Sequence, residues 1–80
     1  MITISPNPTS SYLNYLFSEE NKYPFKYKIL TAVGNCVGHG QIESAFGTIN
    51  IENFENGIYF IEFDDNENKL LERKKCIILK

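Results

Sequence analysis

Short runs in which apolar and polar residues alternate recur along this chain, and this period of two constrains its fold more than any other feature. Phe25, Tyr27 and Ile29 alternate with Lys26 and Lys28, the clearest contrast between two faces in the sequence. Successive side chains of a β-strand point to opposite faces, so such a run indicates a strand with one buried face. No segment shows helical apolar spacing over three turns. The sequence therefore predicts an all-β fold.

Turn-forming residues separate these runs at the intervals expected of a β-sandwich or barrel. We expect about seven short strands, near residues 1–5, 11–17, 25–31, 36–43, 47–51, 57–64 and 69–79. Residues 42–46 allow a turn of helix, but Gly47 and the β-branched residues after it favour a loop between strands. The predicted fold class is an antiparallel β-sandwich.

The predicted strand over residues 57–64 is apolar on both faces. Tyr59, Ile61 and Phe63 form one face, while Ile58 and Phe60 make the other face partly apolar. Two-sided apolarity indicates a central strand whose second face is covered by a neighbour or a partner. An apolar surface patch is the other interpretation.

Few residues carry the chemistry of a catalytic or metal site. His39 is the only histidine, and no Cys, Asp or Glu cluster stands around it at metal-ligand spacing. Cys36 lies three residues earlier, an odd offset that would put the two side chains on opposite faces of one strand. Gly38 and Gly40 inside a strand indicate a bulge or a frayed edge. We therefore expect no metal, no cofactor and no catalytic group, and so no enzyme.

Two other features have both a chemical and a structural interpretation. Residues 64–68 open like a calcium loop, but Lys69 replaces its glycine and Lys75 its bidentate acid, so a solvated hairpin turn is favoured. Cys36 and Cys76 are too few for a disulfide scaffold, and the sequence does not settle whether they pair. Two separate buried thiols are the favoured interpretation.

Length and charge bound the classes of function. A chain of 80 residues makes one domain with a thin core. With 8 basic and 10 acidic residues, its net charge of -2 lacks the basic surplus that nucleic acid binding requires. The longest apolar runs are far shorter than the roughly 20 residues of a membrane helix. The first residues lack the basic flank and apolar stretch of a signal peptide.

Turns built on proline or glycine form three motifs in a fixed order. The first is a Pro-Asn-Pro turn, the second a glycine turn followed by a valine, and the third a glycine followed by a tyrosine. Their residues are Pro6, Asn7, Pro8, Gly34, Val37, Gly57 and Tyr59. The prolines fix φ and remove amide donors, which ends a strand. Gly34 supplies the positive φ that a tight hairpin requires.

The last segment is basic and apolar, and it contains Lys74, Lys75, Ile77, Ile78 and Lys80. Together with the three motifs, in this order and spacing, it resembles the type A carboxyl-terminal sorting domain of the type IX secretion system of Bacteroidetes. The resemblance covers nearly the whole chain. It implies an immunoglobulin-like sandwich of seven or so strands, with a tyrosine corner in which the phenol of Tyr59 caps backbone across a loop.

The resemblance also implies that residues 1–80 form a single sorting domain, an address rather than an enzyme. Because such a domain acts after reaching the periplasm and the first residues carry no signal peptide, we expect the chain to be the tail of a longer secreted precursor. Such a domain directs a cargo protein across the outer membrane to the cell surface or the medium. Its partners would be the type IX translocon, which would read Lys74, Lys75, Ile77, Ile78 and Lys80, and a sortase-like surface protease that removes the domain. From the residues alone, lysines on a terminal strand equally indicate protection of a sheet edge against aggregation.

An immunoglobulin-like binding or accessory module of a surface adhesin or hydrolase is the alternative function. Tyr12, Tyr23 and Phe60 would be its exposed aromatic contacts with sugar or protein. Carbohydrate sites usually combine aromatic platforms with polar groups, and no polar constellation adjoins these residues in the sequence. The cargo, the cleavage site and the oligomeric state are left open by the sequence.

Overall fold

The computed structural model describes residues 2–5, 11–17, 24–65 and 67–80, and every structural statement below concerns these residues. They form seven strands and no helix: β1 (Ile2–Ser5), β2 (Tyr12–Phe17), β3 (Phe25–Thr31), β4 (Cys36–Ile42), β5 (Phe46–Asn50), β6 (Gly57–Asp64) and β7 (Leu70–Ile78). Each predicted strand is confirmed, and its described bounds differ by one residue at most. Residues 43–45 form a loop, as predicted.

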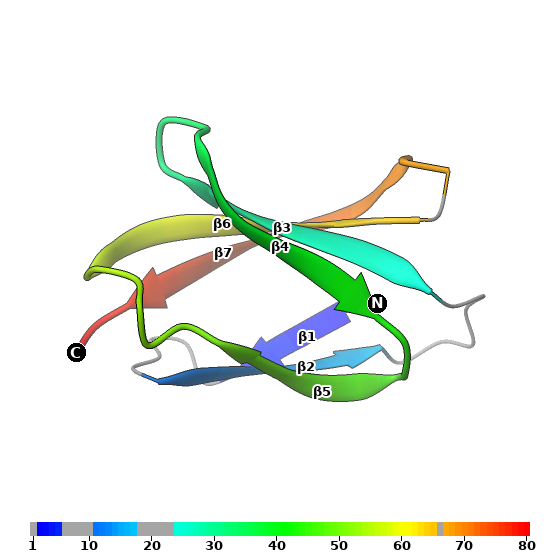
Figure 1. Ribbon diagram of the computed structural model, residues 1–80, viewed down its shortest axis with the longest axis horizontal. Helices are drawn as coiled ribbons and strands as arrows, with labels where there is room; N and C mark the ends of the chain where they lie inside the picture. Colours follow the sequence, from blue (N-terminus) through cyan, green and yellow to red (C-terminus); the bar gives the residue numbers. More distant parts are fainter. Residues whose placement is uncertain (1, 6–10, 18–23, 66) are drawn as a thin grey trace.

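The strands form two antiparallel sheets that pack face to face (Figure 1). One sheet has three strands in the order β1-β2-β5, and the other has four in the order β4-β3-β6-β7. The chain crosses between sheets after β2, β4 and β5. The fold is therefore the predicted β-sandwich.

Alternate residues of the strands fill the space between the two sheets. Along β2, Leu13, Tyr15 and Phe17 are buried and their neighbours are exposed. Phe17 stacks on Phe25 of the facing sheet with ring centroids 5.5 Å apart, and meets Phe63 edge-on at 5.8 Å. These ring contacts join the sheets in the two geometries that aromatic quadrupoles favour.

Strand β6 lies in the middle of the four-stranded sheet, paired with β3 on one side and β7 on the other. Its inward residues Tyr59, Ile61 and Phe63 are buried, which confirms the prediction of a central strand. On its outward face Glu62 is also buried, while Phe60 is half-buried and Ile58 is exposed. Side chains of the neighbouring strands, and not another layer, supply this cover.

Edge strand β4 carries a bulge, as its glycines indicated. Ile29 pairs with Gly38 whereas Leu30 pairs with Cys36, so Val37 is the extra residue. The bulge overturns the expectation that Cys36 and His39 face opposite ways, because their partners Leu30 and Lys28 lie on one face of β3. The Cys36 thiol donates to the Gly38 carbonyl oxygen at 3.4 Å.

The two cysteines lie on opposite edges of the four-stranded sheet, β4 and β7. Two strands separate them, so their backbones are about 14 Å apart at about 4.8 Å per strand spacing, far beyond the reach of a disulfide. Both are free thiols. Cys76 is buried and its burial raises the pKa of the thiol. Cys36 is exposed, so the expectation of two buried thiols is wrong for this residue.

The turn between β6 and β7 is the predicted hairpin turn. The Asp65 carboxylate accepts the backbone N–H groups of Glu67 and Lys69, each at 2.9 Å, and Asn68 adopts a φ of 65°. An aspartate that satisfies backbone donors in this way acts as a turn-former. No cluster of three metal-ligating side chains occurs in the described part of the chain, and no helix there could span a membrane.

Two glycines on edge strands each lie beneath a tyrosine ring. Gly47 of β5 pairs with Tyr15, and Gly40 of β4 pairs with Tyr27. A Cβ at Gly47 would lie 2.5 Å from the Tyr15 hydroxyl oxygen, and one at Gly40 would lie 2.7 Å from that of Tyr27. Tyrosine rings laid over edge glycines fill the space that a side chain would otherwise occupy.

Alanine at these glycines is expected to have unequal effects. Tyr15 is buried and cannot turn away, so Gly47→Ala should lower the free energy of unfolding by about 1–3 kcal/mol through overpacking. Tyr27 is only half-buried, so its ring can move and Gly40→Ala should cost less than about 1 kcal/mol. Urea denaturation of both variants measures the difference, and equal losses would contradict this account.

Candidate functional site

Four of the five residues expected to be read by a translocon lie on β7, an edge strand, and they divide between its two faces. Lys74 pairs with Ile61 on the inward face, and Ile78 follows on that face with only 1% of its surface exposed. Lys75 and Ile77 pair with Phe60 and Ile58 on the outward face. The five residues therefore do not form one surface.

The outward face near the end of β7 is apolar. Leu30, Phe60 and Lys75 lie side by side across β3, β6 and β7, and Ile58 lies opposite Ile77 in the next outward row. Ile58 is 45% exposed, and Phe60 and Ile77 are half-buried. A sheet face with this composition can bury apolar surface against a partner while Lys75 sets the charge at its rim.

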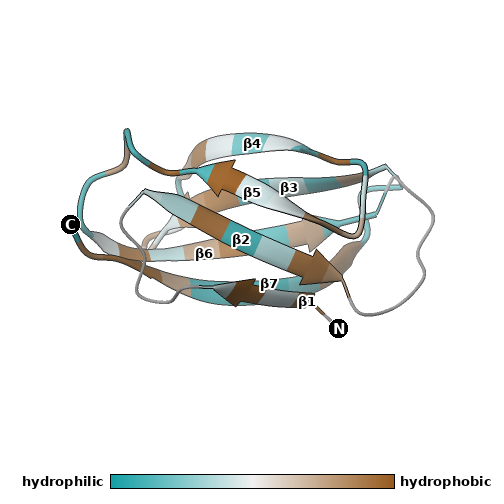
Figure 2. Ribbon diagram, turned by 90° about the horizontal axis from the view of Figure 1, so that it is seen from below, coloured by the Kyte–Doolittle hydropathy of each residue, from teal (hydrophilic) through white to brown (hydrophobic). Residues whose placement is uncertain are grey.

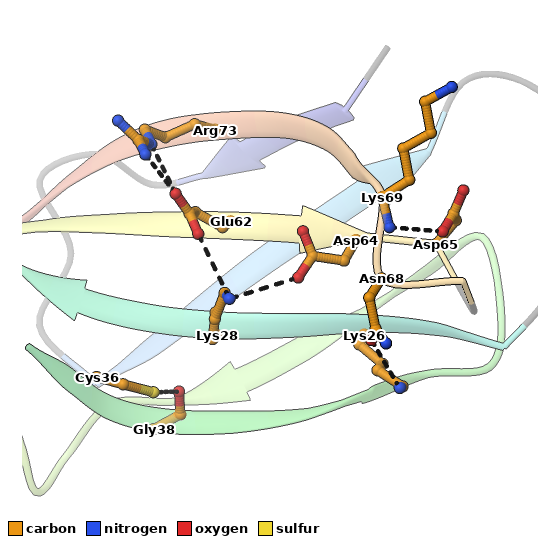
Figure 3. Close-up of polar contacts among 10 residues, drawn as sticks. All are labelled: Lys26, Lys28, Cys36, Gly38, Glu62, Asp64, Asp65, Asn68, Lys69 and Arg73. Carbon is orange, nitrogen blue, oxygen red and sulfur yellow. Dashed lines mark hydrogen bonds and ion pairs between the residues drawn. The ribbon is translucent and has the colours of Figure 1, made fainter. Parts of the chain in front are cut away.

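The other end of the same face is a chain of ion pairs, drawn in Figure 3. Glu62 accepts a hydrogen bond from Arg73 Nε at 2.9 Å, and Lys28 Nζ lies 3.8 Å from both Glu62 and Asp64. The Arg73 guanidinium also lies 6.0 Å from the Phe60 ring centre. The charges of both carboxylates are therefore already paired with cations within the described part of the chain.

A hollow lies over the charged end, and Lys26, Lys28, His39 and Gln41 are among the residues that line it. Lys26 Nζ donates to Asn68 Oδ1 at 3.1 Å, which ties β3 to the β6–β7 turn. Burial raises the pKa of Tyr27, which also borders the hollow. Among the described residues that line the hollow, no nucleophile is paired with a base.

Glu72 links the first and last strands of the domain. One carboxylate oxygen accepts the Ile2 backbone N–H at 2.9 Å, and the other lies 2.9 Å from Lys74 Nζ. The contact ties the edge of one sheet to the edge of the other, on the side where β1 and β7 lie together (Figure 2). Burial raises the pKa of Glu72, but the hydrogen bonds from Lys74 and Ile2 and the Lys74 charge outweigh it and lower the pKa overall.

The tyrosine corner is confirmed in the loop between β5 and β6. Tyr59 Oη donates to the Glu55 carbonyl oxygen at 2.8 Å, four residues upstream. The Tyr59 ring lies 5.8 Å from that of Phe54, whose backbone N–H donates to the Ile51 carbonyl at 3.1 Å. Gly57, the first residue of β6, lies between Glu55 and Tyr59 in the sequence. Hydrogen bonds to the Ile51 and Glu55 carbonyls therefore hold the start and the later part of the loop.

Lys80 contacts this same loop. Its backbone N–H donates to Asn56 Oδ1 at 2.9 Å, and its ammonium donates to the Glu52 carbonyl oxygen. Sequence reasoning did not find Asn56, Glu52 or Glu72, because each acts on a strand or segment far along the chain. A lone asparagine before a glycine predicts only a turn.

The remaining motif residues have structural positions. Gly34 adopts a φ of 94° and donates its N–H to the Thr31 carbonyl at 2.9 Å, which closes the β3–β4 turn as predicted. Val37 is the bulged residue of β4. Pro6, Asn7 and Pro8 lie outside the described residues, between β1 and β2.

The aromatic residues of the alternative binding module do not form one platform. Tyr12 lies on the outward face of the three-stranded sheet, and Phe60 lies on the outward face of the four-stranded sheet. Tyr23 lies outside the described residues. The sandwich therefore separates the two aromatics that the structure describes.

The fold and its surface define a small β-sandwich whose described residues offer a contact face and no catalytic constellation. The family model of the secretion system C-terminal sorting domain matches residues 3–79, and the chain belongs to this family. This family acts as a sorting signal for type IX secretion and is not a catalytic one, which implies contact with that secretion machinery and export to the surface or medium. No curated protein matches the chain.

Removing the phenol of the tyrosine corner should weaken the fold without changing it. Tyr59→Phe leaves the ring in place and the Glu55 carbonyl without its donor, so the free energy of unfolding should fall by about 1 kcal/mol. Tyr27→Phe is the matched control, since the described residues offer its hydroxyl no hydrogen bond. Thermal and urea unfolding measure both, and equal effects would argue against the corner.

The Glu72 contact should make stability depend on pH in the acid range. A carboxylate whose folded-state pKa lies below its ordinary 4.5 stabilises the fold above that value, and this contribution is lost as the pH falls through the folded pKa. Glu72→Gln should therefore be less stable than the native chain at pH 7 by about 1 kcal/mol. The difference should shrink as the pH falls below 4.5 and through the lowered folded pKa. Lys74→Met should shrink the same pH-dependent difference, and a difference that stays constant as the pH falls from 7 into the acid-unfolding range would contradict the assignment.

Proposed function

We propose that this chain is the C-terminal domain of a longer secreted precursor, and that the folded domain directs its cargo through the type IX translocon to the cell surface or medium. The match of the family over residues 3–79 carries this proposal. A stable sandwich supports it, because a translocon that reads a folded domain needs side chains held in fixed positions.

We further propose that the translocon contacts the outward face of β6 and β7. Lys75 and Ile77 belong to this face, and Ile58 and Phe60 extend it. Lys74 contributes through Glu72, and Ile78 contributes through the core, because its side chain is almost fully buried. Lys75 and Ile77 are then contacted directly, whereas Lys74 and Ile78 hold β7 in place.

Removal by a sortase-like surface protease is the third part of the proposal. Proteases bind their substrates as extended segments, and β1 is held by its pairing with β2 and by the Ile2 hydrogen bond to Glu72. These contacts favour cleavage on the amino-terminal side of Ile2, in the segment that joins the domain to its cargo. The domain would then leave as an intact sandwich.

Export of a fluorescent reporter fused ahead of residues 1–80, in strains with and without a working type IX translocon, tests the function. The reporter should reach the surface or the medium only when the translocon works. Periplasmic retention of a folded fusion in both strains would overturn the sorting function and favour a binding module.

Substitutions on the outward face test the contact surface. Lys75→Glu combined with Ile77→Ser should leave the domain folded and lower export about tenfold, the effect of losing about 1.4 kcal/mol of binding free energy. His39→Gln is the matched control, because His39 lies on the same face at the far edge of the sheet. Native export by the folded double variant would refute the proposed surface.

A further inference from the structure

The two residues after β7, Leu79 and Lys80, which we name the tail segment, are held at both ends. Ile78, immediately before them, is buried in the core. Lys80, which ends the segment, makes two contacts with the β5–β6 loop through its backbone N–H and its ammonium. Residues beyond the last strand of a domain ordinarily fray unless they are tied down. Here the core and the loop fix the backbone on either side of Leu79.

The loop that holds Lys80 is itself held by several internal hydrogen bonds. Asn50 Oδ1 accepts the Glu52 backbone N–H at 2.9 Å, and Tyr59 anchors the carbonyl of Glu55, next to Asn56. The loop that carries the acceptors for Lys80 is thus held by contacts that do not involve the tail segment. A preorganised acceptor costs less conformational entropy to engage than a mobile one.

Leu79 is the side chain that this arrangement displays. It is 61% exposed, although Ile78 beside it is buried, so burial in the fold does not account for its position. Along β7 the outward residues are Arg73, Lys75 and Ile77, and Leu79 is the next residue in that period of two. Because contacts on both sides already hold the backbone at Leu79, a partner that buries its side chain restricts little further backbone freedom.

We propose that Asn56 is a positioning residue for sorting: with Glu52 it holds Lys80 so that Leu79 is presented to an apolar pocket of the secretion machinery. Lys80 then holds the tail segment against the β5–β6 loop, and the secretion machinery does not contact its charge. This inference rests on the proposed sorting function. It adds Leu79 to the outward residues that make direct contact, and it assigns a positioning role to Asn56 of the β5–β6 loop.

Asn56→Leu tests the positioning role, because it removes the acceptor oxygen and keeps a side chain of similar size. The readout specific to the tail segment is the rate at which carboxypeptidase B releases Lys80 from the 80-residue chain. That rate should rise about fivefold, the factor that corresponds to the loss of about 1 kcal/mol. Asn56→Asp keeps the acceptor and should retain the native rate. Asn53→Leu, an exposed asparagine of the same loop, is the matched control.

Reporter export by the same variants tests the link to sorting. Asn56→Leu and Leu79→Ser should each lower export at least about fivefold, whereas Asn56→Asp and Asn53→Leu should be exported like the native chain. Leu79→Ser should leave the release of Lys80 slow, since it changes the displayed side chain and not the contacts that hold it.

The outcomes separate this inference from the sorting function. If the native fusion is exported in a translocon-dependent manner but Leu79→Ser and Asn56→Leu are exported equally well, the inference is wrong and sorting stands. If Asn56→Leu does not speed the release of Lys80, the hold on the tail segment is wrong. If the native fusion itself is not exported, the proposed sorting function is wrong, and the inference that rests on it is wrong as well.

Discussion

The antiparallel pairing of β6 with β7 is the interaction on which the rest of the structure depends. It extends from Gly57 opposite Ile78 to Asp64 opposite Leu70, and β6 in turn pairs with β3. Strand β7 is therefore joined to its sheet through β6 alone. The same strand β6 supplies Tyr59, which anchors the loop that receives Lys80. Strand β6 thus sets the register of β7 and, with it, which residues of β7 face inward or outward. Through Tyr59 it also fixes the loop that holds Lys80.

The arrangement of strands could be predicted from the sequence because strand formation in this chain follows local rules. Where one face of a strand is buried, its residues alternate, as Leu13, Tyr15 and Phe17 do along β2. Where both faces are apolar, as in β6, the strand lies inside a sheet. Tyr59 could be assigned to a tyrosine corner because its acceptor lies only four residues upstream. Each of these features depends on residues close together in the chain.

The features that were missed depend on the register or the position of neighbouring strands. Alternation assigns faces only while the register is continuous. The glycines of β4 indicated a bulge, but only the pairing with β3 places it at Val37, between Cys36 and His39. Glu72 lies on the inward face of an edge strand, where a charge is tolerated because Lys74 and the Ile2 N–H satisfy it. The charge pattern of β7 alone indicates a solvated strand. Only the position of β1 beside β7 shows that Glu72 closes one side of the sandwich.

The division of β7 into two faces determines which experiments on its recognition can be interpreted. Deleting residues 73–80 would remove the core side chains Cys76 and Ile78 together with the outward residues Lys75 and Ile77. It would also take away Arg73, whose hydrogen bond to Glu62 joins β7 to β6. Loss of export after such a deletion would therefore report unfolding as readily as lost recognition. Substitutions confined to the outward face keep the core intact, so only they separate the surface that a partner reads from the fold that presents it.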